Sequence, residues 1–106
     1  MLYRYEFAHN HKGFITELDD LFGEDKAWEL SFYFDLHLER PAADLKGTMS
    51  FFTEKGNRKF SKTIKKIKKF ASEKGYEVIR IEKEEKDLEI LYKDEYQVLA
   101  LRNLTT

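Results

Sequence analysis

Cysteine is absent from the sequence, which excludes disulfide bonds, thiolate catalysis and thiolate metal sites. Proline is nearly absent, since Pro41 is the only one, and no linker rich in proline or serine divides the chain. A chain of 106 residues has the usual length of one domain. We therefore expect residues 1–106 to form a single domain without covalent cross-links.

Long hydrophobic runs are also missing. No apolar segment approaches the roughly 18 residues that a membrane-spanning helix needs, and residues 1–6 alternate and carry charge, unlike a signal peptide. Both features predict a cytoplasmic protein that makes no membrane contact. The sequence has no glycine-rich phosphate loop, Ser/His/Asp pattern or Glu-x-x-His motif, so we expect no cofactor and assign no catalytic residue.

Charged residues make up 37% of the sequence, and the net charge of −1 conceals an uneven distribution. Residues 57–75 hold eight Lys or Arg and one Glu, a local charge of +7. Residues 1–56 hold six basic and eleven acidic residues, and residues 76–106 hold five and eight. One segment is therefore strongly cationic in an otherwise acidic chain.

The clearest periodicity lies in residues 28–39. Every even position is apolar: Trp28, Leu30, Phe32, Phe34, Leu36 and Leu38. The odd positions are mostly polar or charged: Glu29, Ser31, Tyr33, Asp35, His37 and Glu39. A period of two is typical of a strand with one buried and one wet face. We predict a long strand that Arg40-Pro41 ends, because proline removes a ladder donor.

Shorter patterns define the other elements. Residues 16–22 begin with a capping-box-like Thr-Glu-Leu-Asp and end at Gly23, which predicts a short helix. Further strands are expected where apolar and β-branched or aromatic residues cluster, the last two forming a hairpin: 2–8, 48–53, 76–83, 88–92 and 96–101.

The cationic segment has the pattern of a helix docked on one face. Its apolar residues repeat at helical spacing: Phe60, Ile64, Ile67 and Ala71. Asn57 or Ser61 is placed to cap its start, and Gly75 to end it. The chain is thus predicted to be an α+β domain in the order β(α)ββαβββ. A mostly antiparallel sheet of five or six strands would carry one long basic helix on one face.

The solvent side of the basic helix is the first candidate site. Five lysines are expected to cover it: Lys62, Lys65, Lys66, Lys68 and Lys69. Like charges four residues apart oppose helix formation, so an anionic partner such as nucleic acid or an acidic protein surface would relieve a penalty. The alternative is an ordinary solvated face, neutralised within the fold by the acids of residues 82–89.

Histidines beside carboxylates form the second candidate. On the predicted strand, Asp35 and His37 share one face with Glu39, and His9 and His11 lie two residues apart in a predicted loop. If this loop adjoined the strand, these groups would suit a metal or acid–base site. The alternative is that all are plain surface residues, so we treat His9, His11, Asp35 and His37 as candidates only and assign no metal.

The aromatic residues, 15% of the chain, exceed the needs of one core. Tyr33 falls on the polar face of the predicted strand, and Phe51 and Phe52 point to opposite faces of theirs. A second small core would explain this, and so would an exposed patch that recruits a partner or a second copy.

By elimination, these observations favour a small non-catalytic binding or regulatory protein that acts through a protein–protein surface, with a protein partner or self-association. A nucleic-acid-associated protein that uses residues 58–69 is the alternative. A metal-dependent or acid–base enzyme is the third hypothesis.

Overall fold

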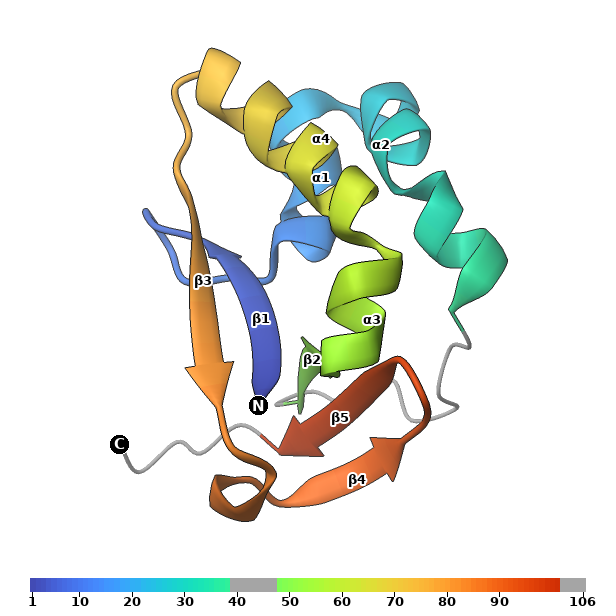
Figure 1. Cartoon of the computed structure of the whole chain (residues 1–106). Helices are drawn as coiled ribbons and strands as arrows, with labels where there is room; N and C mark the ends of the chain where they lie inside the picture. The colour runs from blue at the N-terminus through green and yellow to red at the C-terminus, as the bar shows by residue number, and fades with distance from the viewer. Residues whose placement is uncertain (39–47, 102–106) are drawn as a thin grey trace.

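The structure, a computed structural model, describes residues 1–38 and 48–101, without the side chain of Asp35. Its elements follow the chain in the order β1 (Leu2–Phe7), α1 (Phe14–Phe22), α2 (Glu24–His37), β2 (Thr48–Phe52), α3 (Glu54–Lys59), α4 (Ser61–Glu73), β3 (Val78–Lys83), the 3₁₀ turn η1 (Glu85–Asp87), β4 (Ile90–Lys93) and β5 (Gln97–Leu101). Figure 1 shows the helices gathered on one side of the strands. The predicted α+β class is confirmed.

All five strands belong to one sheet in the order β3-β1-β2-β5-β4, and every neighbouring pair is antiparallel. The predicted strands at the start of the chain, at 48–53 and after residue 76 are present within one or two residues of their expected bounds. Strand β2 pairs with β1 on one side and with β5 on the other.

The largest correction concerns residues 28–39, because residues 24–37 form helix α2 and not a strand. Residues two apart on a helix point about 200° apart, and residues four apart share a face. The run of even apolar positions therefore splits into two opposite stripes. Leu30 and Phe34 face the core, whereas Phe32 and Leu36 are exposed. Residues 39–41, at the predicted strand end, lie outside the described residues.

The cationic segment forms two helices rather than one long one. Helix α3 starts at Thr53, whose hydroxyl accepts a hydrogen bond from the Gly56 N–H at 3.0 Å. The predicted cap Asn57 instead accepts a bond from the Tyr5 hydroxyl, and α4 begins after Phe60 without a side-chain cap. Its predicted end is confirmed, since Gly75 has a φ of 87° and follows the last turn.

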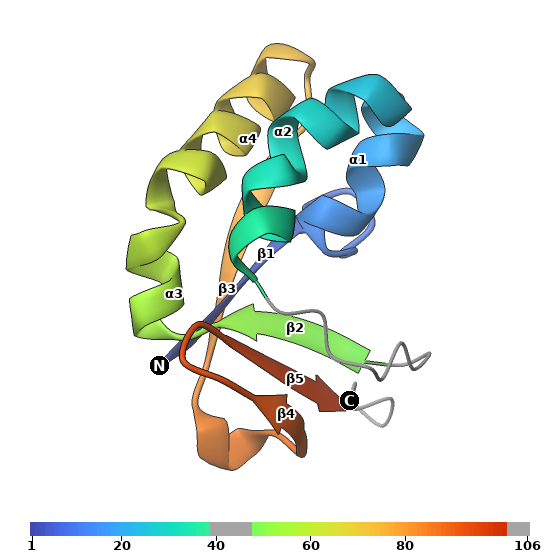
Figure 2. The same ribbon diagram turned by 90° about the vertical axis from the view of Figure 1, so that its right-hand side faces the viewer.

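Two apolar clusters occupy the two faces of the sheet. The larger lies under the helices and joins Phe7 of β1 and Phe52 of β2 to α1, α2 and α4. Figure 2 shows these helices above β2, β4 and β5, with β1 and β3 running up behind them. The smaller, on the opposite face, contains Leu2, Phe51 and Val98. A second small core, one of two explanations given for the aromatic surplus, is therefore present.

The β4–β5 turn is held by one carboxylate. Asp94 accepts hydrogen bonds from the backbone N–H groups of Tyr96 at 2.8 Å and Gln97 at 2.9 Å, and from the Tyr92 hydroxyl at 2.8 Å. Partial burial raises the pKa of Asp94, but these hydrogen bonds outweigh it and leave the pKa below its ordinary value. The hairpin predicted around Asp94 is thus closed by local polar contacts.

The two faces of α2 can be separated by their effect on stability. Replacing Leu30 or Phe34 by Ala should lower the free energy of unfolding by roughly 2–5 kcal/mol, because each leaves a cavity in the core. The same change at Leu36, which is 68% exposed, should stay within about 0.5 kcal/mol. Chemical denaturation measures both. Equal losses at Phe34 and Leu36 would contradict the observed orientation of the helix.

Candidate functional site

The outer face of α2 carries three of the seven large apolar side chains that are exposed among the described residues. Gly23, with a φ of 88°, separates α1 from α2, and the two helices pack together. The inner side of α2 is buried through Ala27, Leu30 and Phe34. One stripe of side chains is left on the outside: Trp28, Phe32 and Leu36. We call these three residues the outer stripe.

The outer stripe is continuous along the helix. Trp28 is 67% exposed, Phe32 39% and Leu36 68%, and their spacing of four residues places them one above the other. The rings of Trp28 and Phe32 stack with centroids 5.5 Å apart and planes 22° apart. Large apolar side chains in one contiguous patch are a mark of an interaction surface, whereas isolated ones are not.

Carboxylates border the outer stripe. At about 100° per residue, Glu24 lies on one side of the stripe, Glu29 on the other, and Asp25 in line with it at the N-terminal end. All three are exposed. One cation pairs with this border: the Lys26 ammonium contacts Glu29 at 3.3 Å and lies 4.5 Å from the centre of the Phe70 ring. The surface is therefore apolar in the middle and negative around it.

The five predicted lysines do lie on the solvent side of α4. Lys62, Lys65, Lys66, Lys68 and Lys69 are all exposed. The opposite side of the helix is buried through Ile64, Ile67 and Ala71.

The alternative to a binding role was that the acids of residues 82–89 neutralise these lysines within the fold. The structure gives them other partners: Glu82 contacts Arg80, Glu84 contacts Lys86, and Glu85 contacts Lys93. Among the residues that the structure describes, no ion pair joins these acids to α4.

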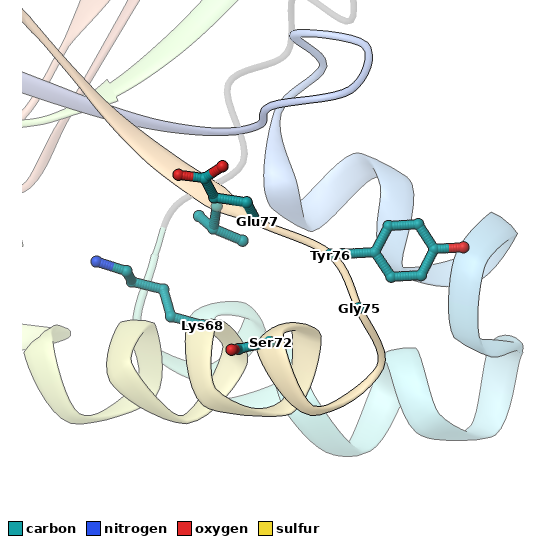
Figure 3. A pocket seen from close by; sticks show the side chains of 6 residues that line it. Lys68, Ser72, Gly75, Tyr76 and Glu77 are labelled. Carbon is teal, nitrogen blue, oxygen red and sulfur yellow. The ribbon is translucent and has the colours of Figure 1, made fainter.

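A hollow of about 410 Å³ lies between α4 and the start of β3 (Figure 3). Lys68 and Ser72 form its helical wall, and Glu77 and Val78 form the wall along the strand. The Tyr76 ring turns away from it, toward Phe7 and Phe22 in the core. The five exposed lysines of α4 are called the lysine face below. The hollow borders the edge strand β3 and contains Lys68, one residue of the lysine face.

The structure does not gather the candidate metal ligands into one site. His9 packs against Tyr76 after β1, and the Nδ1 atom of His11 lies 3.6 Å from the Glu6 carboxylate. His37, in the last turn of α2, packs against the Tyr33 ring with the two ring planes tilted. Because α2 is a helix, Asp35 and His37 do not share a face, and the Asp35 side chain is outside the described set. In the described parts of the chain, no three His, Cys, Asp or Glu residues are placed to hold a metal ion.

A buried ionic group was not predicted from the sequence. The Arg4 Nε donates to the Glu6 carboxylate at 2.6 Å, and a second guanidinium nitrogen donates to the Ser50 carbonyl at 3.3 Å. Glu17 of α1 is also buried and accepts a bond from the Asn10 side chain at 3.1 Å. Arg4 and Glu6 lie on the face of β1 opposite to Tyr5 and Phe7, because side chains alternate along a strand. These contacts brace β1 and the loop that follows, and every buried side-chain polar atom in the described chain has a partner.

Comparison of the chain with protein-family models, with curated proteins and with solved structures finds no match in any of the three. None of the helices in the described ranges is long and apolar enough to span a membrane.

Zinc provides a direct test of the histidines. Ligand binding to the native state raises stability by RT ln(1 + [L]/Kd). Because His9, His11 and His37 lie apart, we expect zinc added in slight excess to leave the melting temperature unchanged. A rise of several degrees in thermal denaturation, lost in His9→Ala or His37→Ala, would contradict this arrangement and support the enzyme hypothesis.

Proposed function

We propose that the protein is a small non-catalytic binding or regulatory protein, and that the outer stripe of α2 is the surface through which it binds a protein partner. The single observation that carries the proposal is the exposure of Trp28, Phe32 and Leu36 in one row. Burying such side chains against a partner would stabilise the complex by about 25 cal/mol for each Å² of apolar surface removed from water. The same helix buries its other stripe in the core, so the fold does not require apolar side chains on this outer one.

The chemistry of the surface indicates the kind of partner. A helix in contact with the outer stripe would need apolar residues at a spacing of three or four, as helices in hydrophobic grooves have. The carboxylates of Glu24, Asp25 and Glu29 favour lysine or arginine beside those residues. We therefore propose that the partner presents a basic amphipathic helix. Aromatic side chains such as Trp28 often dominate the energy of such interfaces.

The chain contains a reporter for this interaction, because Trp28 is its only tryptophan. The probe is a tryptophan-free helical peptide of leucine and lysine, with leucines spaced three and four apart. Burial of Trp28 should shift its fluorescence to shorter wavelength in a saturable manner. A peptide with glutamate in place of each lysine should bind at least tenfold more weakly, which corresponds to about 1.4 kcal/mol.

Variants locate the binding to α2. Phe32→Ser should weaken the affinity for the basic peptide about tenfold or more, because it removes the centre of the stripe. Leu91→Ser is the matched control, since Leu91 is an exposed apolar residue on β4 and should bind like wild type. Equal affinity for the basic and acidic peptides, or no effect of Phe32→Ser, would contradict the proposal.

Nucleic-acid binding by the lysine face of α4 is the second candidate function. It is supported by the exposure of all five lysines and by the separate partners of Glu82, Glu84 and Glu85. Each phosphate neutralised on duplex DNA contributes about −0.9 to the slope of log K against log salt. Contact by four of the lysines would give a slope near −4.

A salt titration separates the two candidates. If the protein-binding proposal is correct, the protein should not be retained on duplex or single-stranded nucleic acid even at about 50 mM salt, where screening is weak. Steep, salt-dependent binding that falls in Lys65→Glu/Lys69→Glu would instead favour the second candidate. A double variant elsewhere, Lys83→Glu/Lys86→Glu, controls for net charge.

A further inference from the structure

We propose that two copies of the chain pair antiparallel along strand β3, with a two-fold axis at Ile81, so that their sheets join into one. This surface is separate from α2, and the inference does not depend on the proposed function. Its ligand is a second copy of the same chain, recognised by the backbone and by the charge order of β3.

Strand β3 has an open edge in the part of the chain that the structure describes. It lies at one end of the sheet, and β1 is its one neighbour among the described strands (Figure 1). The Glu77 carbonyl accepts a hydrogen bond from the Ala8 N–H at 2.9 Å, so the backbone groups of odd-numbered residues face β1. Those of Val78, Arg80 and Glu82 consequently point away from the sheet. Such a row of backbone donors and acceptors is a template for another strand.

The other edge strand is less suited to pairing. Strand β4 has four residues, against six in β3, and its register with β5 shifts between Ile90 and Tyr92. Short or irregular edges are a common protection against strand addition.

The charges on β3 are self-complementary in one register. With the axis at Ile81, Arg80 lies directly opposite Glu82 of the second copy, and Glu82 opposite its Arg80. Both residues are exposed and already form a 3.0 Å ion pair within one strand. Moving the axis by one residue in either direction sets Arg80 against Arg80 or Glu82 against Glu82. Directly opposed like charges destabilise a strand pair, so the side chains select a single register.

The ends of the paired strands also match. In this register Val78 lies opposite Glu84 of the second copy. Val78 lines the hollow that contains Lys68, so the acids that follow β3 in one copy approach the lysine face of the other. Glu77 lines the same hollow and has the same charge as the approaching acids. Its repulsion offsets part of their attraction to Lys68, so this end contributes less than the two Arg80–Glu82 pairs. The acids of residues 82–89 in one copy would thus approach α4 of the second copy, and not α4 of their own chain.

A cysteine placed on the axis tests the register. Residues opposite each other at a non-hydrogen-bonded position of an antiparallel pair have Cα atoms about 4.5 Å apart, which a disulfide can bridge. Ile81→Cys introduces the only cysteine of the chain. Under oxidised glutathione it should convert most of the protein to a disulfide-linked dimer on a non-reducing gel.

The matched control is Ile79→Cys, on the same strand and the same face. In the proposed register the two copies of residue 79 lie about 13 Å apart, because each is two residues from the axis. Ile79→Cys should therefore remain monomeric on the gel. Equal cross-linking of both variants would indicate random collision, and no cross-linking of Ile81→Cys would exclude the axis. Either result overturns the inference.

A charge exchange tests the same register without a covalent bond. Sedimentation should give wild type a mass twice the chain mass of 12.7 kDa. Arg80→Glu or Glu82→Arg alone opposes like charges and should weaken the dimer at least tenfold. The double variant Arg80→Glu/Glu82→Arg should restore it. A monomeric wild type, or a double variant no tighter than the single ones, would overturn the inference.

Folding and the α2 surface are controlled separately. Circular dichroism and melting temperature identify a variant that does not fold, and the cysteine pair then decides the question. Phe32→Ser, which should weaken peptide binding on α2, should leave the dimer intact. Loss of one property with retention of the other therefore distinguishes a failure of this inference from a failure of the proposed function.

Discussion

The arrangement of the helical layer depends on the burial of Phe60. Its ring is fully buried and meets those of Tyr33, Phe34, Phe52 and Tyr96, with centroids between 5.2 and 6.1 Å apart. These neighbours come from α2, β2 and the residue before β5. Phe60 also lies at the junction of α3 and α4, so a single residue fixes where the basic segment bends and how it sits on the sheet.

The orientation of both candidate surfaces follows from this contact. Phe34 packs on Phe60 and on Phe14 of α1, which fixes the rotation of α2 about its axis. The outer stripe must then point away from the core. On α4, burial of Ile64 and Ile67 one and two turns after Phe60 leaves the lysines on the solvent side. The charge asymmetry seen in the sequence thus becomes an asymmetry between two neighbouring helices.

Local patterns were sufficient for most of the fold. Strands β1, β2, β3 and β5 have unambiguous alternation or β-branched and aromatic content, and α4 has a stripe at helical spacing that no strand would show. The α+β class, the antiparallel sheet and the exposed lysines could therefore be predicted. The break at Phe60 could not, because it depends on tertiary contacts with rings far away in the sequence.

Helix α2 could not be recognised because its pattern has two solutions. Apolar residues at every second position fit one buried face of a strand, and they fit equally well a helix with two opposite stripes. In a strand, one core would bury all the even-numbered apolar residues. In the helix, the core buries only one of the two stripes and leaves the other exposed. Gly23 followed by Glu24 and Asp25 was the available signal, since a glycine and an acidic first turn are typical of a helix boundary. The same ambiguity concealed the outer stripe as a candidate site.

The two proposed surfaces would act together in one assembly. Pairing along β3 continues the sheet, so the helical layers of both copies remain on the same side of it. Each copy then presents its own outer stripe on that side. A partner with two basic helices, or a partner that is itself dimeric, would bind the second stripe at an effective concentration set by the geometry rather than by its concentration in solution. Two outer stripes engaged at once would hold such a partner more tightly than either stripe alone.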